Sequence, residues 1–224
     1  MNYPQLPLIN VYPISESQPS PWQVVIAKCS GESIPRVEIA NTPLEFAEIT
    51  ARKIYVNKLQ TALENALRVS EEYKKCISLM QPLANVPSIQ KYRTRYPHFD
   101  SDGVDHEIKL YGGLLHPGQV LFHGGVWPGS NEGNIFGQKI TLTKPLSTTL
   151  CAGVAGAHSN SHNPKQIWVI TVSSLICTPA YLFSNKGNQP LADEREVLFS
   201  SGAIIECIAG RQLEHYQILE VLIT

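Results

Sequence analysis

The chain has 224 residues, of which 43% are hydrophobic and 17% are charged, proportions typical of a folded globular protein. Its formal net charge of −1 provides no overall basic field of the kind that attracts nucleic acid or an anionic membrane. No apolar run approaches the roughly 20 residues of a membrane-spanning helix. We therefore expect no nucleic-acid partner and no membrane span.

The first 40 residues favour extended structure. Five prolines within residues 1–21 predict an extended arm that is neither a helix nor a central strand. Residues 22–30, WQVVIAKCS, are rich in β-branched side chains and favour a strand.

A helical region follows, and its start is marked clearly. Thr42 is the predicted N-cap, Pro43 occupies the first helical position and Glu45 completes a capping box. Apolar residues then recur at steps of three and four as far as about Gln81. This span predicts either one long helix or two helices with a break near Asn57 or Ser70, ended by Pro82.

Residues 91–100, KYRTRYPHFD, close the helical region. Alternating basic and aromatic residues of this kind can stack on a base and pair with phosphate. A solvated connector with long side chains lying along the surface is the favoured interpretation. We assign residues 1–107 to a Pro-rich arm and a mainly helical N-terminal region.

The remaining residues, 108–224, are predicted to be rich in strands. Short apolar runs such as QIWVITV and YQILEVLIT are separated by glycine, asparagine and proline, a spacing that suggests a sandwich or a pair of sheets. The whole chain is therefore expected to be an α+β protein that forms one compact domain overall.

Three segments of this β-rich part carry candidate site residues. In VLFHGGVWPG (120–129), His123 ends an apolar strand and is followed by Gly124 and Gly125, which would let a ligand lie against the backbone. Residues 144–156 contain a hydroxyl cluster at 147–149. Glu194 and Glu196 precede a strand, where alternation predicts their carboxylates on one face about 7 Å apart. Two such charges raise one carboxyl pKa.

The order and spacing of these segments resemble the ADP-ribosyltransferase family. That family carries an aromatic-Arg/His-Gly strand, a Ser-Thr-Ser strand and a Glu-x-Glu strand start, which this chain matches with Phe122-His123-Gly124, Ser147-Thr148-Thr149 and Glu194-Arg195-Glu196. The resemblance covers residues 108–224 and implies a split β-sandwich of two packed sheets with a helical N-terminal region. Two departures from the pattern are His123, where members with this serine and glutamate set usually have arginine, and Thr149.

The resemblance also implies an activity and a set of roles. The chain is expected to be a mono-ADP-ribosyltransferase of the toxin or effector type. NAD⁺ would be its consumed substrate and a protein side chain, with arginine as the candidate, its acceptor. Glu196 would stabilise the ribosyl cation, Ser147 would orient Glu196, and Glu194 would position or deprotonate the acceptor. The NAD⁺-binding residues implied are Phe122, His123, Gly124, Gly125, Thr148 and Thr149.

Several alternatives stay open from the residues alone. Water as the acceptor would make the chain an NAD⁺ glycohydrolase, and His123 in place of arginine is compatible with an inactive relative that acts as a binding protein. His158 and His162 have the i, i+4 spacing of metal ligands, but no third ligand is apparent, so no metal is expected. The N-terminus lacks the pattern of a Sec signal. The expected location is therefore the cytoplasm, or a host cell reached without such a signal.

Overall fold

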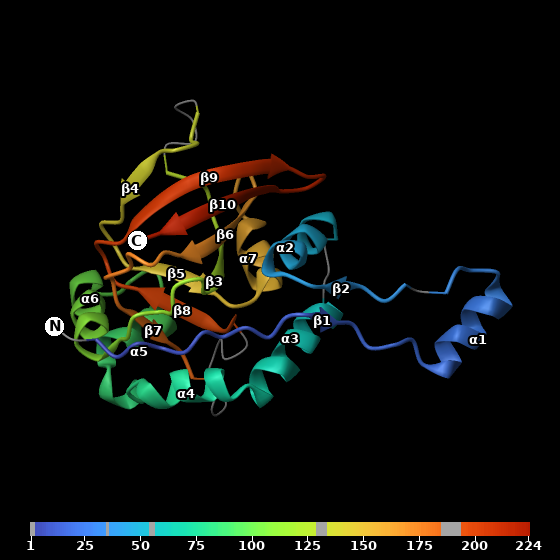
Figure 1. The fold of residues 1–224 in the computed structure, drawn as a ribbon, viewed down its shortest axis with the longest axis horizontal. Coiled ribbons are helices and arrows are strands. Elements are labelled where there is room, and N and C mark those ends of the chain that lie inside the picture. The colour runs from blue at the N-terminus through green and yellow to red at the C-terminus, as the bar shows by residue number, and fades with distance from the viewer. Residues whose placement is uncertain (1–2, 35, 54–56, 129–133, 185–193) are drawn as a thin grey trace.

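The computed structural model describes residues 3–224, with the exception of 35, 54–56, 129–133 and 185–193. Within these residues the protein contains seven α-helices, an eight-stranded mixed sheet and a separate two-stranded ladder. Figure 1 shows the helices gathered around the sheet, with one helix standing apart on an extended arm. The prediction of an α+β protein is confirmed.

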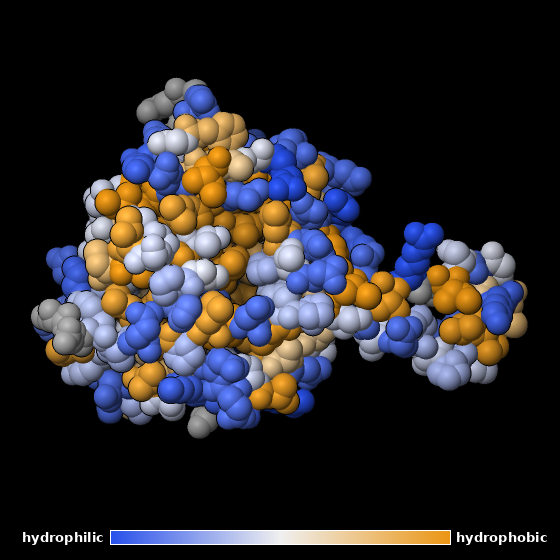
Figure 2. Space-filling model, viewed as in Figure 1, coloured by the Kyte–Doolittle hydropathy of each residue, from blue (hydrophilic) through white to orange (hydrophobic). Residues whose placement is uncertain are grey.

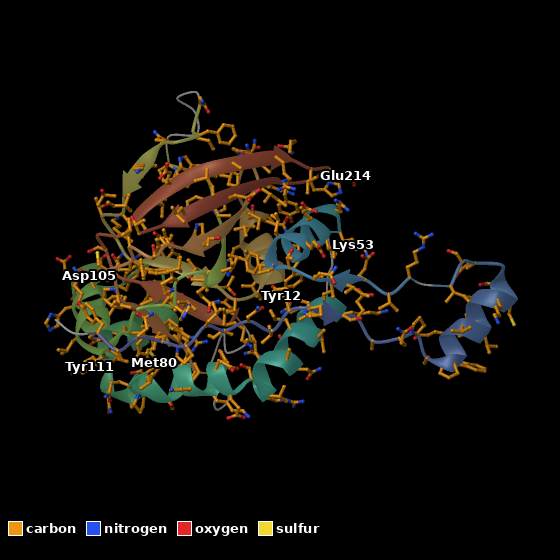
Figure 3. All side chains as sticks on the ribbon, viewed as in Figure 1. Tyr12, Lys53, Met80, Asp105, Tyr111 and Glu214 are labelled. Carbon is orange, nitrogen blue, oxygen red and sulfur yellow. The ribbon has the colours of Figure 1, made fainter. Side chains whose placement is uncertain are left out.

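The proline-rich N-terminus is extended, as predicted, but residues 4–12 form a strap that is part of the core. Leu6 and Ile9 are buried, and the Leu6 amide donates to the Leu114 carbonyl at 2.8 Å. The Gln119 side chain accepts from the Ile9 amide at 2.8 Å and donates to the Ile9 carbonyl at 3.2 Å. The strap continues to Tyr12, which is labelled in Figure 3. It then enters β1 (Ile14–Ser15), which pairs with β2 (Ile39–Ala40).

The strand predicted at residues 22–30 is wrong: Pro21–Ser30 is helix α1. Ser20 caps it in a reciprocal capping box with Gln23, Pro21 occupies the first turn, and Gly31 ends it in the left-handed conformation. These end signals outweigh the β-branched composition, because α1 projects away from the sheet and has no strand beside it with which to pair (Figure 1).

The predicted helical region is divided into three helices, with interruptions at both of the positions considered. α2 spans Pro43–Arg52, α3 spans Asn57–Val69 and α4 spans Glu71–Leu79. Thr42 caps α2 as predicted, but Glu45 accepts from the Asn41 amide at 2.8 Å instead of completing a capping box with Thr42. Ser70 separates α3 from α4. Its hydroxyl accepts a hydrogen bond from the Tyr73 amide at 3.1 Å and so caps the start of α4.

The solvated connector predicted at 91–100 is also wrong over its first half. Following a short 3₁₀ turn at Leu83–Asn85, helix α5 runs from Pro87 to Arg95, and helix α6 from Ser101 to Tyr111. Tyr92 and Arg93 of α5 are buried. Helix α6 crosses the boundary that we place at residue 107, and that boundary stays a prediction.

The large sheet has the strand order β4-β9-β10-β6-β3-β5-β8-β7. Its only parallel pair among the described strands is β10 with β6. Helix α7 (Ala152–Ser159) follows β5 along the chain. The strands are β3 (Val120–Gly124), β4 (Lys139–Thr141), β5 (Leu146–Thr149), β6 (Gln166–Val172), β7 (Ala180–Leu182), β8 (Glu196–Phe199), β9 (Ile204–Gln212) and β10 (Gln217–Ile223).

This sheet is almost divided in two between β3 and β5. Those strands share a single register pair, Phe122 with Thr149, whereas β3 pairs with β6 over five residues. The sheet thus consists of a five-stranded part, β4-β9-β10-β6-β3, and a three-stranded part, β5-β8-β7, joined by this pair. None of the described helices is long and apolar enough to span a membrane.

Candidate active site

The ends of β3, β5 and β8 bring the three predicted motifs together. β5 pairs with β8 in a register that sets Thr149 opposite Glu196 and Ser147 opposite Leu198. The one register pair between β3 and β5 then places His123 beside Ser147. Residues separated by more than 70 positions in the sequence therefore meet at one point of the sheet.

Glu196 lies at the centre of this cluster, at the start of β8, and is only 6% exposed. Its Oε1 accepts a hydrogen bond from the Ser147 hydroxyl at 2.7 Å and another from the Tyr92 hydroxyl at 3.1 Å. Burial raises the pKa of Glu196, and the two hydroxyl donors and the nearby Arg93 oppose that shift. These three groups therefore favour the charged form of Glu196, against the effect of burial.

Tyr92 is a site residue that the sequence analysis missed. It reaches Glu196 from α5, 104 positions earlier in the chain. Helix α5 has no side-chain cap of its own, and Glu107 of α6 accepts from the Ser88 and Ile89 amides at 3.0 and 2.9 Å in its place. Pro87 at the first helical position was a usable signal for this helix, but nothing local indicated where Tyr92 would point.

Glu194 does not share a strand face with Glu196, because the alternation that we predicted is interrupted. Arg195 has φ +50°, a left-handed conformation, and β8 begins only at Glu196. The Glu194 carboxylate instead contacts His158 of α7, with Oε1 3.4 Å from Nε2. One carboxyl pKa of the pair is raised, as predicted, but burial of Glu196 is the main cause and the Glu194 charge contributes less.

Thr148 and Thr149 hold the backbone that carries the two glutamates. The Thr148 hydroxyl donates to the Val197 carbonyl at 2.7 Å. The Thr149 hydroxyl donates to the Glu194 carbonyl and accepts from the Cys151 amide at 3.0 Å. Both threonines are buried and bond to the backbone, and their assignment to NAD⁺ binding stays a prediction.

His123 is held as a neutral imidazole. Its Nδ1 lies 2.7 Å from the Ser147 carbonyl, which can only accept, so Nδ1 carries the hydrogen and Nε2 is an acceptor. Burial lowers the pKa of His123 to about 4, and the ring packs against Trp168 at 4.5 Å between centroids. A neutral ring suits a hydroxyl donor, such as a ribose hydroxyl, better than an anionic diphosphate.

The structure explains the neighbours of His123 largely by packing. Phe122 is 1% exposed and packs edge-on against Phe46 of α2, so its side chain belongs to the core, and its assignment to ligand binding stays a prediction. A Cβ on Gly124 would lie 1.9 Å from the Ala155 carbonyl oxygen, because α7 crosses β3 there. The space on the Cβ side of Gly124 is therefore filled by α7. At Gly125 the neighbour is His123 itself, since a Cβ there would lie 2.5 Å from Nε2 of His123.

The described residues contain no group of three or more His, Cys, Asp or Glu side chains placed to hold a metal ion. His158, one of the two histidines with metal-ligand spacing, contacts Glu194 instead.

Comparison with known proteins gives matches in structure alone. No family model and no curated protein matches the sequence. The fold is similar to that of the Vis toxin, an ADP-ribosyltransferase from Vibrio splendidus. The identity is 14% and the TM-score 0.49, with 81% of this chain and 91% of that chain covered. It is also similar to a C3-type ADP-ribosyltransferase from Clostridium botulinum, with 12% identity, a TM-score of 0.47 and coverages of 77% and 97%.

A third similar structure is an ADP-ribosylating toxin from a binary enterotoxin of C. perfringens, determined with NADH. It is 13% identical with a TM-score of 0.40, and the match covers 90% of this chain and 48% of that chain. All three structures are of ADP-ribosylating proteins.

Proposed function

We propose that this protein is a mono-ADP-ribosyltransferase that consumes NAD⁺ and transfers ADP-ribose to a protein side chain. The observation that carries the proposal is the buried Glu196, held by the Ser147 and Tyr92 hydroxyls, with His123 bonded to the Ser147 carbonyl. A buried carboxylate held by two hydroxyl donors is already oriented to face a developing positive charge.

The reaction requires this kind of group. The bond between the anomeric carbon and the nicotinamide nitrogen breaks, and its electron pair goes to nicotinamide, which leaves as a neutral molecule. The remaining ribosyl centre has the character of an oxocarbenium ion, as in glycoside cleavage. Glu196 would stabilise that charge and bind the ribose hydroxyl, a contribution typically worth about 3–4 kcal/mol.

The other residues have roles that follow from their contacts. Ser147 and Tyr92 would orient the Glu196 carboxylate, since both of their hydroxyls donate to its Oε1. His123, through its acceptor Nε2, would bind a ribose hydroxyl of NAD⁺. Glu194 would hold the acceptor, whose nitrogen forms the new bond to the anomeric carbon and loses its proton to the Glu194 carboxylate.

The test is Glu196→Gln, which keeps the shape and removes the charge. We expect nicotinamide release from NAD⁺ to fall by at least about 100-fold, while the melting temperature stays close to that of the wild type. Glu206→Gln on β9, which replaces a glutamate paired with Lys139 outside the site, is the matched control and should keep full activity. Near-wild-type turnover by the Glu196→Gln protein would contradict the proposal.

The acceptor is tested separately with labelled NAD⁺ and a cell lysate. A labelled protein band, absent with the Glu196→Gln variant, is the result expected for a transferase. Nicotinamide release without any labelled protein would instead indicate a glycohydrolase, and an intact protein that neither binds nor cleaves NAD⁺ would indicate an inactive relative.

A further inference from the structure

One contact at the site has no role in the scheme above, and it involves the acceptor glutamate. His158 lies in the last turn of α7, and its Nε2 is 3.4 Å from Oε1 of Glu194. The His158 side chain is 57% exposed and that of Glu194 is 25% exposed. Both groups are therefore reachable by an incoming acceptor.

The charged and titratable groups around His158 favour its protonated form. Its hydrogen bond to Glu194 raises the pKa of His158, partial burial opposes this, and the charges of Glu194 and Glu196 add to the increase. His123 on β3 and His162 beyond α7 also face this region, and His158 in turn lowers the pKa of His123. The hydrogen bond and the two carboxylates thus hold the pKa of His158 above its ordinary value.

We propose that His158 competes with a cationic acceptor for Glu194, so that protonation of His158 selectively weakens transfer to guanidinium groups. The proposal rests on the function proposed above. Protonated His158 forms an ion pair with the carboxylate that an arginine side chain must bind, and the acceptor has to displace it. Neutral His158 leaves Glu194 with its full negative charge.

Hydrolysis of NAD⁺ should not depend on this competition. Water needs no cation-binding carboxylate, and the ribosyl cation is faced by Glu196 from β8. His158 would therefore set the ratio between transfer and hydrolysis without controlling nicotinamide release itself. Because exposed ion pairs are weak, the effect on acceptor binding should be a few-fold and not larger.

The experiment uses agmatine, a small guanidine, as the acceptor between pH 5.5 and 8.5. ADP-ribosyl-agmatine and nicotinamide are measured together, because their ratio cancels changes that affect both reactions, such as titration of Glu196. For the wild-type protein we expect the KM for agmatine to fall about three- to five-fold as the pH rises through the raised pKa of His158.

Three variants sharpen the result. His158→Gln cannot become charged and should show the low KM at every pH, whereas His158→Lys stays charged and should show the high KM at every pH. His162→Gln, which removes the neighbouring exposed histidine, should keep the wild-type profile. Nicotinamide release without agmatine should be the same for all four proteins.

The outcomes separate this inference from the proposed function. If the wild-type protein releases no nicotinamide, both are overturned. If it releases nicotinamide but does not modify agmatine, or if His158→Gln keeps the pH-dependent KM, only the role of His158 is overturned. A loss of transfer at every pH in His158→Gln would show that His158 holds Glu194 in place, which also contradicts competition.

Discussion

At the scale of single residues, Ser147 joins the two titratable groups of the site. Its hydroxyl donates to Glu196, and its carbonyl accepts from His123. Burial acts on the two groups in opposite directions, since it raises the pKa of Glu196 and lowers that of His123. Both shifts favour the neutral forms, and the Ser147 and Tyr92 hydroxyls oppose the shift at Glu196.

The low pKa of His123 predicts a pH-dependent stability. Its pKa is about 4 in the folded protein and about 6.5 when unfolded, so between these values the unfolded chain binds more protons. The free energy of unfolding should therefore fall as the pH drops from about 6.5 to 4, with a slope of up to about 1.4 kcal/mol per pH unit from this residue.

The comparison of wild type with His123→Gln in urea titrations isolates this slope. Glu196 contributes with the opposite sign, because a raised pKa stabilises the fold on acidification, but it does so in both proteins. The variant should lose stability less steeply on acidification than the wild type. Parallel curves for the two proteins would show that His123 is protonated as readily in the folded state as in the unfolded chain.

At the scale of elements, the approach of α7 to β3 determines how the site is built. The helix passes so close to Gly124 that no side chain fits there, and its last turn carries His158 to Glu194. Helix α5, capped by Glu107 of the neighbouring helix, delivers Tyr92 to Glu196. Two helices from different parts of the chain thus complete a site whose centre is on strands.

Gly124→Ala tests the contact between α7 and β3. The added methyl would overlap the Ala155 carbonyl oxygen, so α7 must move, and we expect a loss of about 2–3 kcal/mol in the free energy of unfolding. Gly153→Ala in the first turn of α7 is the control. Its Cβ would lie 3.1 Å from the end of the flexible Gln60 side chain, so stability should change by less than about 1 kcal/mol. Equal stability of both variants would contradict the close approach.

At the scale of the whole molecule, the N-terminal segment divides into a strap that stabilises the body and an arm that stands away from it. The strap buries Leu6 and Ile9, whereas α1 buries only Ala27 and exposes Trp22 at 70%. Figure 2 shows apolar side chains on this projecting helix. The free energy of folding should therefore depend on the strap and hardly at all on the arm.

Excision of the arm tests this division. The Glu16 amide donates to the Glu38 carbonyl at 3.0 Å, so a tight glycine–asparagine turn can join these residues in place of 17–37. We expect the melting temperature to change by less than about 2 °C. Leu6→Ala, which empties a fully buried position in the strap, should cost about 2–5 kcal/mol. Unfolding of the excised protein would show that α1 supports the body.

The sequence by itself determined features that depend on neighbouring residues and on their order. The start of α2 at Thr42 and Pro43, the α+β class and the order of the three motifs were all predicted from such patterns. Capping and alternation act within a few residues, and the sequence displays them directly.

Only the tertiary structure decided which groups complete the site and which pack beneath it. Tyr92 reaches Glu196 across 104 positions, Phe122 turns into the core, and Gly124 is required by α7. The left-handed Arg195 likewise separated Glu194 from Glu196 and turned it towards His158. The physical reason is that contacts between distant segments depend on how helices and strands pack, and a pattern of neighbouring residues does not specify that packing.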